Sequence, residues 1–540
     1  MKKCILLVAL ICLFSFHSFA QTWLWGEAGE CKNSTTLDPS VSPVAADCFG
    51  NAYRGGYYGG GNLIFGLDTV KRIGAYLAKY NKNGNIIWAK NEGSFQCQSV
   101  ACDLDGNVFL AGDSTTHNLS VLQKCDSSGN VTWAEYSQNG NASARFVTTD
   151  SKGNSYITGN VSGTVTFGSV TLSPSANSVP YAAKYDKNGN AIWAKSAVVS
   201  STSNDISYCV AADKFGNVYE TGDFRQLISF GKDTLNTQNA PGDVYLVKYD
   251  SLGNVLWARQ SVTPDVSNQG YASSVVVDNE GNAYITGSYR DTISFGSFTL
   301  TAPKSNNYTF YSIYFAKYDS KGNVVWAQTQ HNGLNWIGFS LSADTMDHIY
   351  MDASYGYDTL KFGSYSLYTS NNPTAILQFD TAGNVLCASS VSNARPSDVE
   401  NEWVTASSDP TGQYIYLGGL MGLGTVFCGP DTVLDVYGPC YTLRWESCSI
   451  ITGMDDISHN LTRVGIFPNP NNGVFTITSK EIDGRVEIYN MVGEKVNIRA
   501  SGEVNGEIRI DIGKQPPGMY FYRIISPGST SIVSGKFIVE

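Results

Sequence analysis

The sequence predicts an all-β protein: a seven-bladed β-propeller closed by its N-terminal strand, followed by a small C-terminal β-sandwich. Two repeated motifs and one missing strand predict this fold. The first motif is YDKNGNAIW at 185–193, with near-copies ending at Trp88, Trp133, Trp257 and Trp326 and a degenerate copy ending at Cys387. Its Asp and Gly favour a type I turn followed by a left-handed residue, which closes a hairpin. The Trp then falls on the outgoing strand, where its ring covers a sheet face.

The second motif fixes the number of units. Most of its copies read as an apolar run, Asp, two residues, Gly-Asn, an aromatic residue and then a Gly. Its seven copies, 47 to 66 residues apart, begin at Asp47, Asp103, Asp150, Asp213, Asp278, Asp344 and Asp409. Periods of this size indicate a solenoid, an array or a propeller. Each unit offers four short strands, which in the fifth unit are expected at 274–278, 283–287, 314–319 and 324–328. Seven units of four strands predict a seven-bladed propeller.

The two ends of the repeat region complement each other. The seventh unit has a third strand at 441–445, after which the composition changes and no fourth strand follows. The segment Trp23–Glu27 resembles Ile87–Asn91, the fourth strand of the first unit. We therefore expect the N-terminal strand to complete the last blade and remove two exposed strand edges.

A Phe-Gly pair recurs between the second and third strands of most units. It occurs at Phe65-Gly66, Phe167-Gly168, Phe230-Gly231, Phe295-Gly296 and Phe362-Gly363. We interpret it as an added hairpin whose Phe packs on the blade, and the second unit lacks it. The fifth unit has the longest version, in which Tyr308, Phe310 and Tyr311 form an aromatic cluster. These three residues are candidate ligand contacts, and local packing of a long loop is the alternative.

Composition excludes one class of partner. The formal charge is −11, and residues 463–540 contain nine basic and eight acidic residues, which leaves −12 on the rest of the chain. An acidic body argues against nucleic-acid binding.

The N-terminus has the features of a secretory signal peptide. Residues 1–20 combine Lys2 and Lys3 with an apolar core at 4–16 and the small-x-small site Ser18-Phe19-Ala20. No later run approaches the length of a membrane helix. Ten cysteines remain after cleavage, and an exported protein can oxidise them. Cys428 with Cys440 and Cys31 with Cys448 are candidate pairs. The alternative is that most cysteines are small buried residues, as Cys387 in a Trp position suggests.

No catalytic or cofactor-binding set emerges from the sequence. The five histidines occur in unrelated contexts, and no nucleophile elbow, phosphate loop or CxxC pair is present. The loops after Asp103 and Asp186 superficially suggest calcium sites, but both lack the distal Glu of such a loop. We expect these aspartates to cap hairpins. The sequence thus predicts no enzyme, no metal and no cofactor.

Residues 21–449 resemble bacterial β-propeller repeat proteins, on the copies of Asp-x-x-Gly-Asn and Lys-Tyr-Asp-x-x-Gly-Asn-x-x-Trp-Ala quoted above. After a linker at 450–462, residues 463–540 resemble the type IX secretion sorting domain of Bacteroidetes. Four motifs carry that resemblance, at 467–477, 486–493, 518–524 and 535–540. The sorting-signal residues that it implies are Pro468, Asn469, Pro470, Gly473, Gly518, Tyr520, Lys536 and Val539.

The resemblance implies Sec export to the periplasm, then passage across the outer membrane with the type IX secretion machinery as partner. The expected location is the cell surface or the medium. Three functions stay open: a propeller that binds a glycan, a protein or another surface component; a glycan hydrolase or lyase with carboxylates at the channel; and a structural surface component.

Overall fold

The computed structural model describes two compact units, residues 1–448 and 449–540, apart from the segments omitted below. The described residues are 23–32, 43–60, 62–174, 176–200, 205–237, 242–264, 269–305, 308–309, 311–329, 337–354, 360–362, 365–367, 374–393, 405–410, 412, 414–420, 424–428, 431–436, 440–446, 465–467, 472–478, 485–490, 495–504, 507–525 and 532–539. They form strands, turns and loops, with no helix among them. None of these residues accordingly belongs to a helix able to span a membrane. The expected signal peptide lies outside them.

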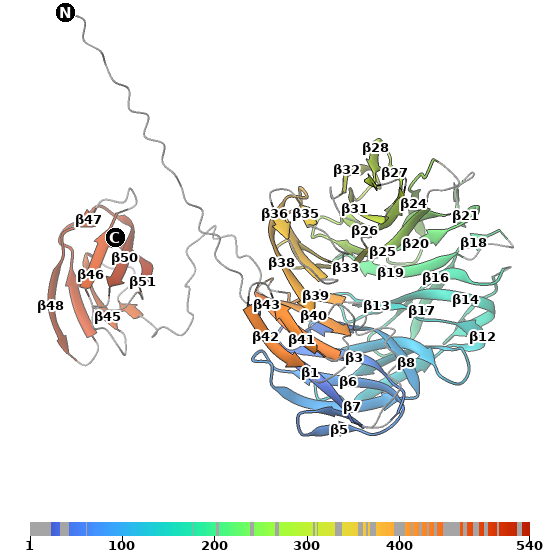
Figure 1. Cartoon of the computed structure of the whole chain (residues 1–540), viewed down its shortest axis with the longest axis horizontal. Helices are drawn as coiled ribbons and strands as arrows, with labels where there is room; N and C mark the ends of the chain where they lie inside the picture. The colour runs from blue at the N-terminus through green and yellow to red at the C-terminus, as the bar shows by residue number, and fades with distance from the viewer. Residues whose placement is uncertain are drawn as a thin grey trace, which may run out of the picture. The chain divides into compact units, whose positions relative to one another are not determined.

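The first unit is a β-propeller of antiparallel sheets that each contain four main strands, and in three of the sheets further strands raise the number to six (Figure 1). We number the sheets 1 to 7 in chain order. The main strands of sheets 1 to 3 are, for sheet 1, β2 (Val44–Ala46), β3 (Ala52–Tyr58), β6 (Gly74–Tyr80) and β7 (Ile86–Gly93); for sheet 2, β8 (Phe95–Cys102), β9 (Val108–Ser114), β10 (Ser120–Cys125) and β11 (Val131–Tyr136); and for sheet 3, β13 (Phe146–Thr149), β14 (Ser155–Phe167), β16 (Val179–Tyr185) and β17 (Ala191–Ser196). Those of sheets 4 and 5 are, for sheet 4, β19 (Ile206–Ala212), β20 (Val218–Phe224), β23 (Asp243–Tyr249) and β24 (Val255–Gln260); and for sheet 5, β25 (Gln269–Val277), β26 (Ala283–Arg290), β31 (Tyr311–Tyr318) and β32 (Val324–Thr329). Those of sheets 6 and 7 are, for sheet 6, β33 (Ile337–Ala343), β34 (Ile349–Ser354), β37 (Thr374–Phe379) and β38 (Val385–Asn393); and for sheet 7, β39 (Thr405–Ser408), β40 (Tyr414–Leu420), β43 (Cys440–Glu446) and β1 (Trp23–Lys32). The first strands contact one another in sequence, and β39 contacts β2, so that they follow a closed circuit.

The N-terminal strand lies far along the chain from its neighbour. β1 pairs antiparallel with β43, with Gly26 opposite Leu443 and Ala28 opposite Tyr441. In Figure 1 the blue start of the propeller accordingly lies beside its orange end. Sheet 7 also contacts sheet 1 through polar groups, because the hydroxyl of Thr405 accepts the backbone N–H of Val44 at 3.1 Å.

Added hairpins follow the second strand in most sheets, as the Phe-Gly pairs predict. They are β4 (Asn62–Phe65) with β5 (Asp68–Val70), the end of β14 with β15 (Val170–Leu172), β21 (Leu227–Phe230) with β22 (Asp233–Asn236), β27 (Thr292–Phe295) with β28 (Phe298–Thr301), and β35 (Leu360–Phe362) with β36 (Tyr365–Leu367). Phe167 packs on Tyr181 and Phe295 on Tyr314, each pair with ring centroids 4.9 Å apart. Sheet 7 has a further hairpin without the Phe-Gly pair, β41 (Gly424–Cys428) with β42 (Asp431–Val436), which sequence analysis missed.

The cysteines divide into two groups. Cys387 is buried and disulfide-bonded to a cysteine outside the described side chains, which corrects its interpretation as an unpaired core residue. The described free cysteines are Cys48, Cys97, Cys102, Cys125 and Cys209. Burial raises the pKa of Cys97 to about 12 and that of Cys209 to about 11, so these thiols stay protonated. The side chains of both predicted pairs, Cys428–Cys440 and Cys31–Cys448, lie outside the described set.

The second unit contains two four-stranded antiparallel sheets. One has the order β44 (Gly465–Phe467), β45 (Val474–Thr478), β49 (Glu507–Asp511) and β48 (Arg499–Val504), and the other β47 (Lys495–Val496), β46 (Arg485–Tyr489), β50 (Gly518–Ile525) and β51 (Ile532–Val539). Both sheets contribute to one core, in which Phe475 and Ile510 of the first meet Ile488 and Tyr520 of the second. The unit is therefore a small β-sandwich, as the alternating apolar residues predict.

Candidate functional site

The repeated turn aspartates cap their own hairpins. The Asp150 carboxylate accepts the backbone N–H of Lys152 at 2.9 Å, the Asn154 amide at 2.8 Å and the Tyr156 hydroxyl at 2.8 Å. Burial alone would raise the pKa of Asp150, but these hydrogen bonds outweigh it and lower the pKa. The corresponding aspartates of the other turns bind in the same way, which confirms the capping prediction. Among the described residues, no group of three metal-ligating side chains comes together.

The Lys and Trp of the first motif lock each sheet to the next. Between sheets 4 and 5, Lys248 Nζ and Trp257 Nε1 both donate to the backbone carbonyl of Ser320, at 3.1 and 3.2 Å. The ammonium of Lys248 also lies 4.7 Å from the ring centroid of Tyr219. Gly322 closes this contact, since a Cβ there would come within 2.8 Å of the Trp257 ring. The repeated residues are thus structural, and ligand contacts must be sought where the repeat is broken.

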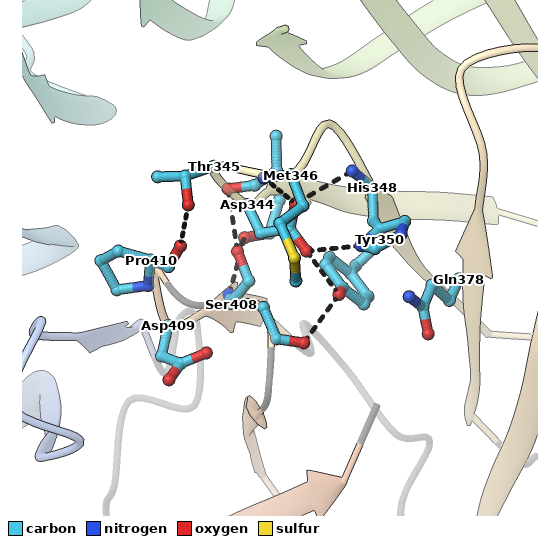
Figure 2. A network of polar contacts seen from close by, with 12 residues as sticks. Asp344, Thr345, Met346, His348, Tyr350, Gln378, Ser408, Asp409 and Pro410 are labelled. Atoms are coloured by element: carbon cyan, nitrogen blue, oxygen red, sulfur yellow. Dashed lines mark hydrogen bonds and ion pairs between the residues drawn. The ribbon is translucent and has the colours of Figure 1, made fainter. Parts of the chain in front are cut away.

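Sheet 6 breaks the repeat at four positions. Asp347 replaces the turn Gly and Cys387 replaces the Trp. His348 replaces the turn Asn and Gln378 replaces the Lys (Figure 2). His348 Nδ1 lies 2.8 Å from the Asp344 carboxylate, which also accepts the Tyr350 hydroxyl at 2.8 Å. The hydrogen bond to Asp344 raises the pKa of His348. Burial opposes ionisation of Asp344, but the hydrogen bonds from His348 lower its pKa overall. His348 therefore takes the place beside the turn Asp that the Lys takes in other sheets, as Lys124 does beside Asp103.

Further hydrogen bonds connect the residues around Asp344 to sheet 7. Thr345 donates through its backbone N–H and its hydroxyl to the carbonyl of Pro410, at 3.2 and 2.6 Å. Tyr350 also donates to the carbonyl of Gly412 at 3.1 Å. These bonds tie sheet 6 to sheet 7, so this departure substitutes one inter-sheet lock for another.

A second departure lies at the opposite end of the sheets from the Asp-Gly-Asn turns. We call it the tyrosine cluster, and it comprises Arg145, Tyr208, Asp223, Tyr271 and Tyr311. Tyr271 and Tyr311 face each other with ring centroids 5.8 Å apart, tilted by 59°. The guanidinium carbon of Arg145 lies 5.8 Å from the Tyr208 ring centroid. The three tyrosines are half-buried and Arg145 is exposed, so part of each tyrosine and the charge of Arg145 are accessible to a ligand.

The carboxylate of the cluster is perturbed by its surroundings. Asp223 is half-buried and accepts the backbone N–H of Ala272, in the next sheet, at 2.5 Å. Loss of hydration raises its pKa to about 8, although this hydrogen bond and one from Tyr208 oppose the shift. Asp113 binds the N–H of Ala144 in the same way at 2.8 Å, and burial raises its pKa to about 6. Both carboxylates therefore accept a backbone hydrogen bond from the next repeat, and these bonds hold neighbouring sheets together.

The three aromatic residues predicted as ligand contacts in the fifth unit do not form one cluster in the described structure. Tyr311 begins β31 and joins the tyrosine cluster. Tyr308 lies on the short strand β30 (Tyr308–Thr309), which pairs with β29 (Lys304–Ser305), and Phe310 lies outside the described residues. Sequence reasoning missed Tyr208, Tyr271, Asp223 and Arg145, because they belong to three different repeats. Comparing each repeat at the start of its first strand would have singled out Arg145, Tyr208 and Tyr271.

The sorting-signal residues gather partly on one strand pair. Gly518 pairs with Val539, and Lys536 pairs with Phe521, along β50 and β51. Tyr520 and Val539 are buried in the sandwich core, and the Tyr520 hydroxyl donates to the Pro516 carbonyl at 2.9 Å. Gly473 has a φ of 94°, and its carbonyl accepts the N–H of Ile512 at 2.9 Å. Pro468, Asn469 and Pro470 lie outside the described residues.

Comparison with known proteins identifies the second unit. Residues 465–540 match the secretion system C-terminal sorting domain family. Over 404 residues, the chain is 25% identical to an uncharacterized WD repeat-containing protein of Acanthamoeba polyphaga mimivirus, covering 58% of this chain and 29% of that protein.

Solved structures of similar fold are distant. The quinohemoprotein alcohol dehydrogenase of Comamonas testosteroni has a TM-score of 0.37 at 11% identity, over 83% of this chain and 79% of that one. The Dos1 propeller has a TM-score of 0.39 at 8% identity, over 79% and 95% of the two chains. Likenesses at this level carry no information on activity. The strand topology makes the first unit a β-propeller. The family match makes the second a type IX sorting domain, which implies export to the cell surface or the extracellular space.

Proposed function

We propose that this protein is a secreted or surface-displayed binding protein, exported by Sec and then by the type IX system, whose propeller holds a glycan or protein ligand at the tyrosine cluster. The propeller has seven blades, which are sheets 1 to 7, and β1 closes the ring as the outer strand of the last. The sorting domain serves only as the address. The mature propeller performs no chemistry.

The observation that carries the ligand site is the paired rings of Tyr271 and Tyr311 beside Tyr208 and Arg145. Half-buried tyrosines offer large rigid contact area together with a hydroxyl, which suits both sugar rings and protein surfaces. They occupy the sheet ends opposite the tight turns, where the longer connections lie, and loops positioned by a rigid scaffold commonly carry function.

The alternative, a glycan hydrolase or lyase, requires two carboxylates that face one site. Asp113, Asp223 and Asp243 are aspartates with raised pKa at this end of the sheets. The first two are bonded to the backbone of the neighbouring sheet, and Asp243 accepts hydrogen bonds from Ser261 and Thr263. This arrangement favours binding over hydrolysis. The third possibility, a structural surface component, predicts no ligand at the cluster.

A glycan array probed with the purified mature chain tests the proposal. The expected result is binding to a defined set of glycans that falls at least tenfold in Tyr271→Ala and Tyr311→Ala, since each ring contributes about 1 to 3 kcal/mol when stacked. Tyr136→Ala, an exposed tyrosine on β11, is the matched control and should bind normally. Unchanged binding in both cluster variants, or turnover of a bound glycan, would contradict the proposal.

A further inference from the structure

The added hairpins cover the outer edges of the sheets. In sheet 1 the Asp68 carboxylate of the hairpin accepts the backbone N–H of Ala89, on the fourth strand, at 3.0 Å. In sheet 4 Asp233 accepts the corresponding N–H of Ala258 at 2.9 Å. In sheet 6 the Tyr365 hydroxyl of the hairpin donates to the carbonyl of Leu386 on the fourth strand. The hairpins therefore satisfy backbone groups that an edge strand would otherwise leave open.

Sheet 2 has no such hairpin. Its second and third strands are joined by residues 115–119 alone, and β11 ends the sheet. Ala134 of β11 is the equivalent of Ala89 in sheet 1 and of Ala258 in sheet 4. Each alanine lies opposite a residue of the third strand, which is Gln123 for Ala134, Ala78 for Ala89 and Val247 for Ala258. The N–H of Ala134 therefore points away from β10. In the part of the chain that the structure describes, no group accepts a hydrogen bond from it.

The solvent exposure of β11 agrees with an uncovered outer edge. Trp133 and Ala134 are half-buried, whereas the equivalent Trp193 and Ala194 of sheet 3 are each 5% exposed. Val131 and Tyr136 are 51% and 43% exposed. Natural edge strands commonly carry Lys, Pro or a short length to prevent pairing with another chain. β11 has six residues, no Lys and no Pro, and Glu135 is its single charge.

We propose that β11 is a docking edge, onto which a partner protein adds an extended segment that carries a basic side chain beside Glu135. The open groups alternate along β11, at Thr132, Ala134 and Tyr136, and extended backbone matches that spacing. The partner segment becomes a fifth strand of sheet 2. This surface lies on the outer rim and is independent of the tyrosine cluster.

Charge selects a basic partner strand over a second copy of this chain. The chain outside residues 463–540 carries a net charge of −12, and Glu135 adds a local negative charge at the edge. Two copies joined through β11 would bring two acidic bodies together, whereas a basic segment is attracted to the same surface.

A designed peptide provides the probe: acetyl-VKVTVKVT-amide, labelled with fluorescein, with acetyl-VEVTVEVT-amide as the charge control. Fluorescence anisotropy with the mature full chain should show binding of the Lys peptide and at least tenfold weaker binding of the Glu peptide. Ala134→Pro should weaken Lys-peptide binding at least tenfold, because it blocks the edge while leaving the pairing with β10 intact. Glu135→Lys should reverse the preference between the two peptides.

A second variant gives the control for folding. Replacing residues 115–119 with residues 225–237 supplies sheet 2 with the hairpin of sheet 4, which should cover β11 and abolish peptide binding. Hydrogen exchange of residues 131–136 should slow when the Lys peptide binds to the unaltered chain, and only there. Equal peptide binding by Ala134→Pro and the unaltered chain, or protection elsewhere, would overturn the proposal. A dimer of the unaltered chain that Ala134→Pro dissociates would overturn it too, by assigning the edge to a second copy.

Discussion

The turn glycines satisfy two independent demands. Gly322 has a φ of +82°, a conformation that residues with a Cβ adopt at a cost, and it also lies against the Trp257 ring. Gly50 has nearly the same φ, +80°, but a Cβ there would meet only the Lys82 Cβ at 3.5 Å, an ordinary contact. Comparing Gly322 with Gly50 therefore separates the cost of the left-handed backbone from the cost of disturbing the contact with Trp257.

We predict that Gly322→Ala destabilises the propeller more than Gly50→Ala does. Both variants lose about 1 to 2 kcal/mol from the left-handed backbone. Gly322→Ala loses about 1 to 3 kcal/mol more, because the new Cβ displaces Trp257. Urea unfolding of the two variants measures the difference, and equal losses would show that the Trp contact contributes nothing.

His348 makes one lock depend on pH. Its pKa is raised by Asp344, so the stability it contributes is fully present below its unfolded pKa and is lost as pH rises through its folded pKa. The pKa of Asp344 is lowered, so its contribution is lost only as pH falls through that lower value. The ion pair is intact between these two limits.

The expected result is a fall in unfolding free energy of the unaltered chain as pH rises above the ordinary His value, by about 1.4 kcal/mol for each unit by which the pKa is raised. His348→Asn, which restores the repeat residue, should remove that part of the slope. The difference between the two chains between pH 6 and 9 is the measurement. Parallel curves would mean that the pair does not titrate in this range.

At the scale of strands and hairpins, local chemistry determines most of what was predictable. The Asp-x-x-Gly-Asn turns and the Phe-Gly hairpins are specified by residues a few positions apart, and both form where expected. The β41–β42 hairpin lacks the Phe-Gly signal and so escaped prediction. The pairing of β1 with β43 joins distant residues, yet the incomplete seventh repeat indicated it.

The candidate site was less predictable, because its residues are far apart in the sequence and local chemistry does not specify their contacts. Tyr271 and Tyr311 belong to one repeat, but Tyr208 and Arg145 come from the two preceding repeats and meet only when the sheets pack. Tyr311 was identified from its aromatic neighbours. Asp223 resembles any polar strand residue in the sequence, and only burial against the next sheet reveals its raised pKa.

We predict that β1 holds the ring closed. Deleting residues 21–28 removes the pairing that runs from Trp23 to Ala28 along β43. At about 1 kcal/mol for each net hydrogen bond, the loss is on the order of 3 to 6 kcal/mol, a large share of ordinary stability. A synthetic peptide of residues 21–32 should restore part of the melting temperature. An unchanged melting temperature in the truncated chain would disprove the closure.

At the scale of the whole molecule, we propose that the two units perform separate tasks. The acidic propeller carries the candidate ligand surfaces, and the nearly neutral sandwich carries the sorting-domain match. Each has its own core, so each can keep its structure when the other is altered. We therefore expect residues 451–540, fused to a periplasm-targeted reporter, to carry that reporter to the surface of a host with the type IX machinery.

Removing Lys536–Glu540 tests the central claim most directly. The truncation deletes the pairing of Lys536 with Phe521 and of Val539 with Gly518, and takes Val539 out of the sandwich core. Fractionation and surface labelling of the expressing cells should find the truncated protein in the periplasm, with a propeller of unaltered melting temperature. Surface display at the normal level would contradict the account, because the second unit would then not be the address.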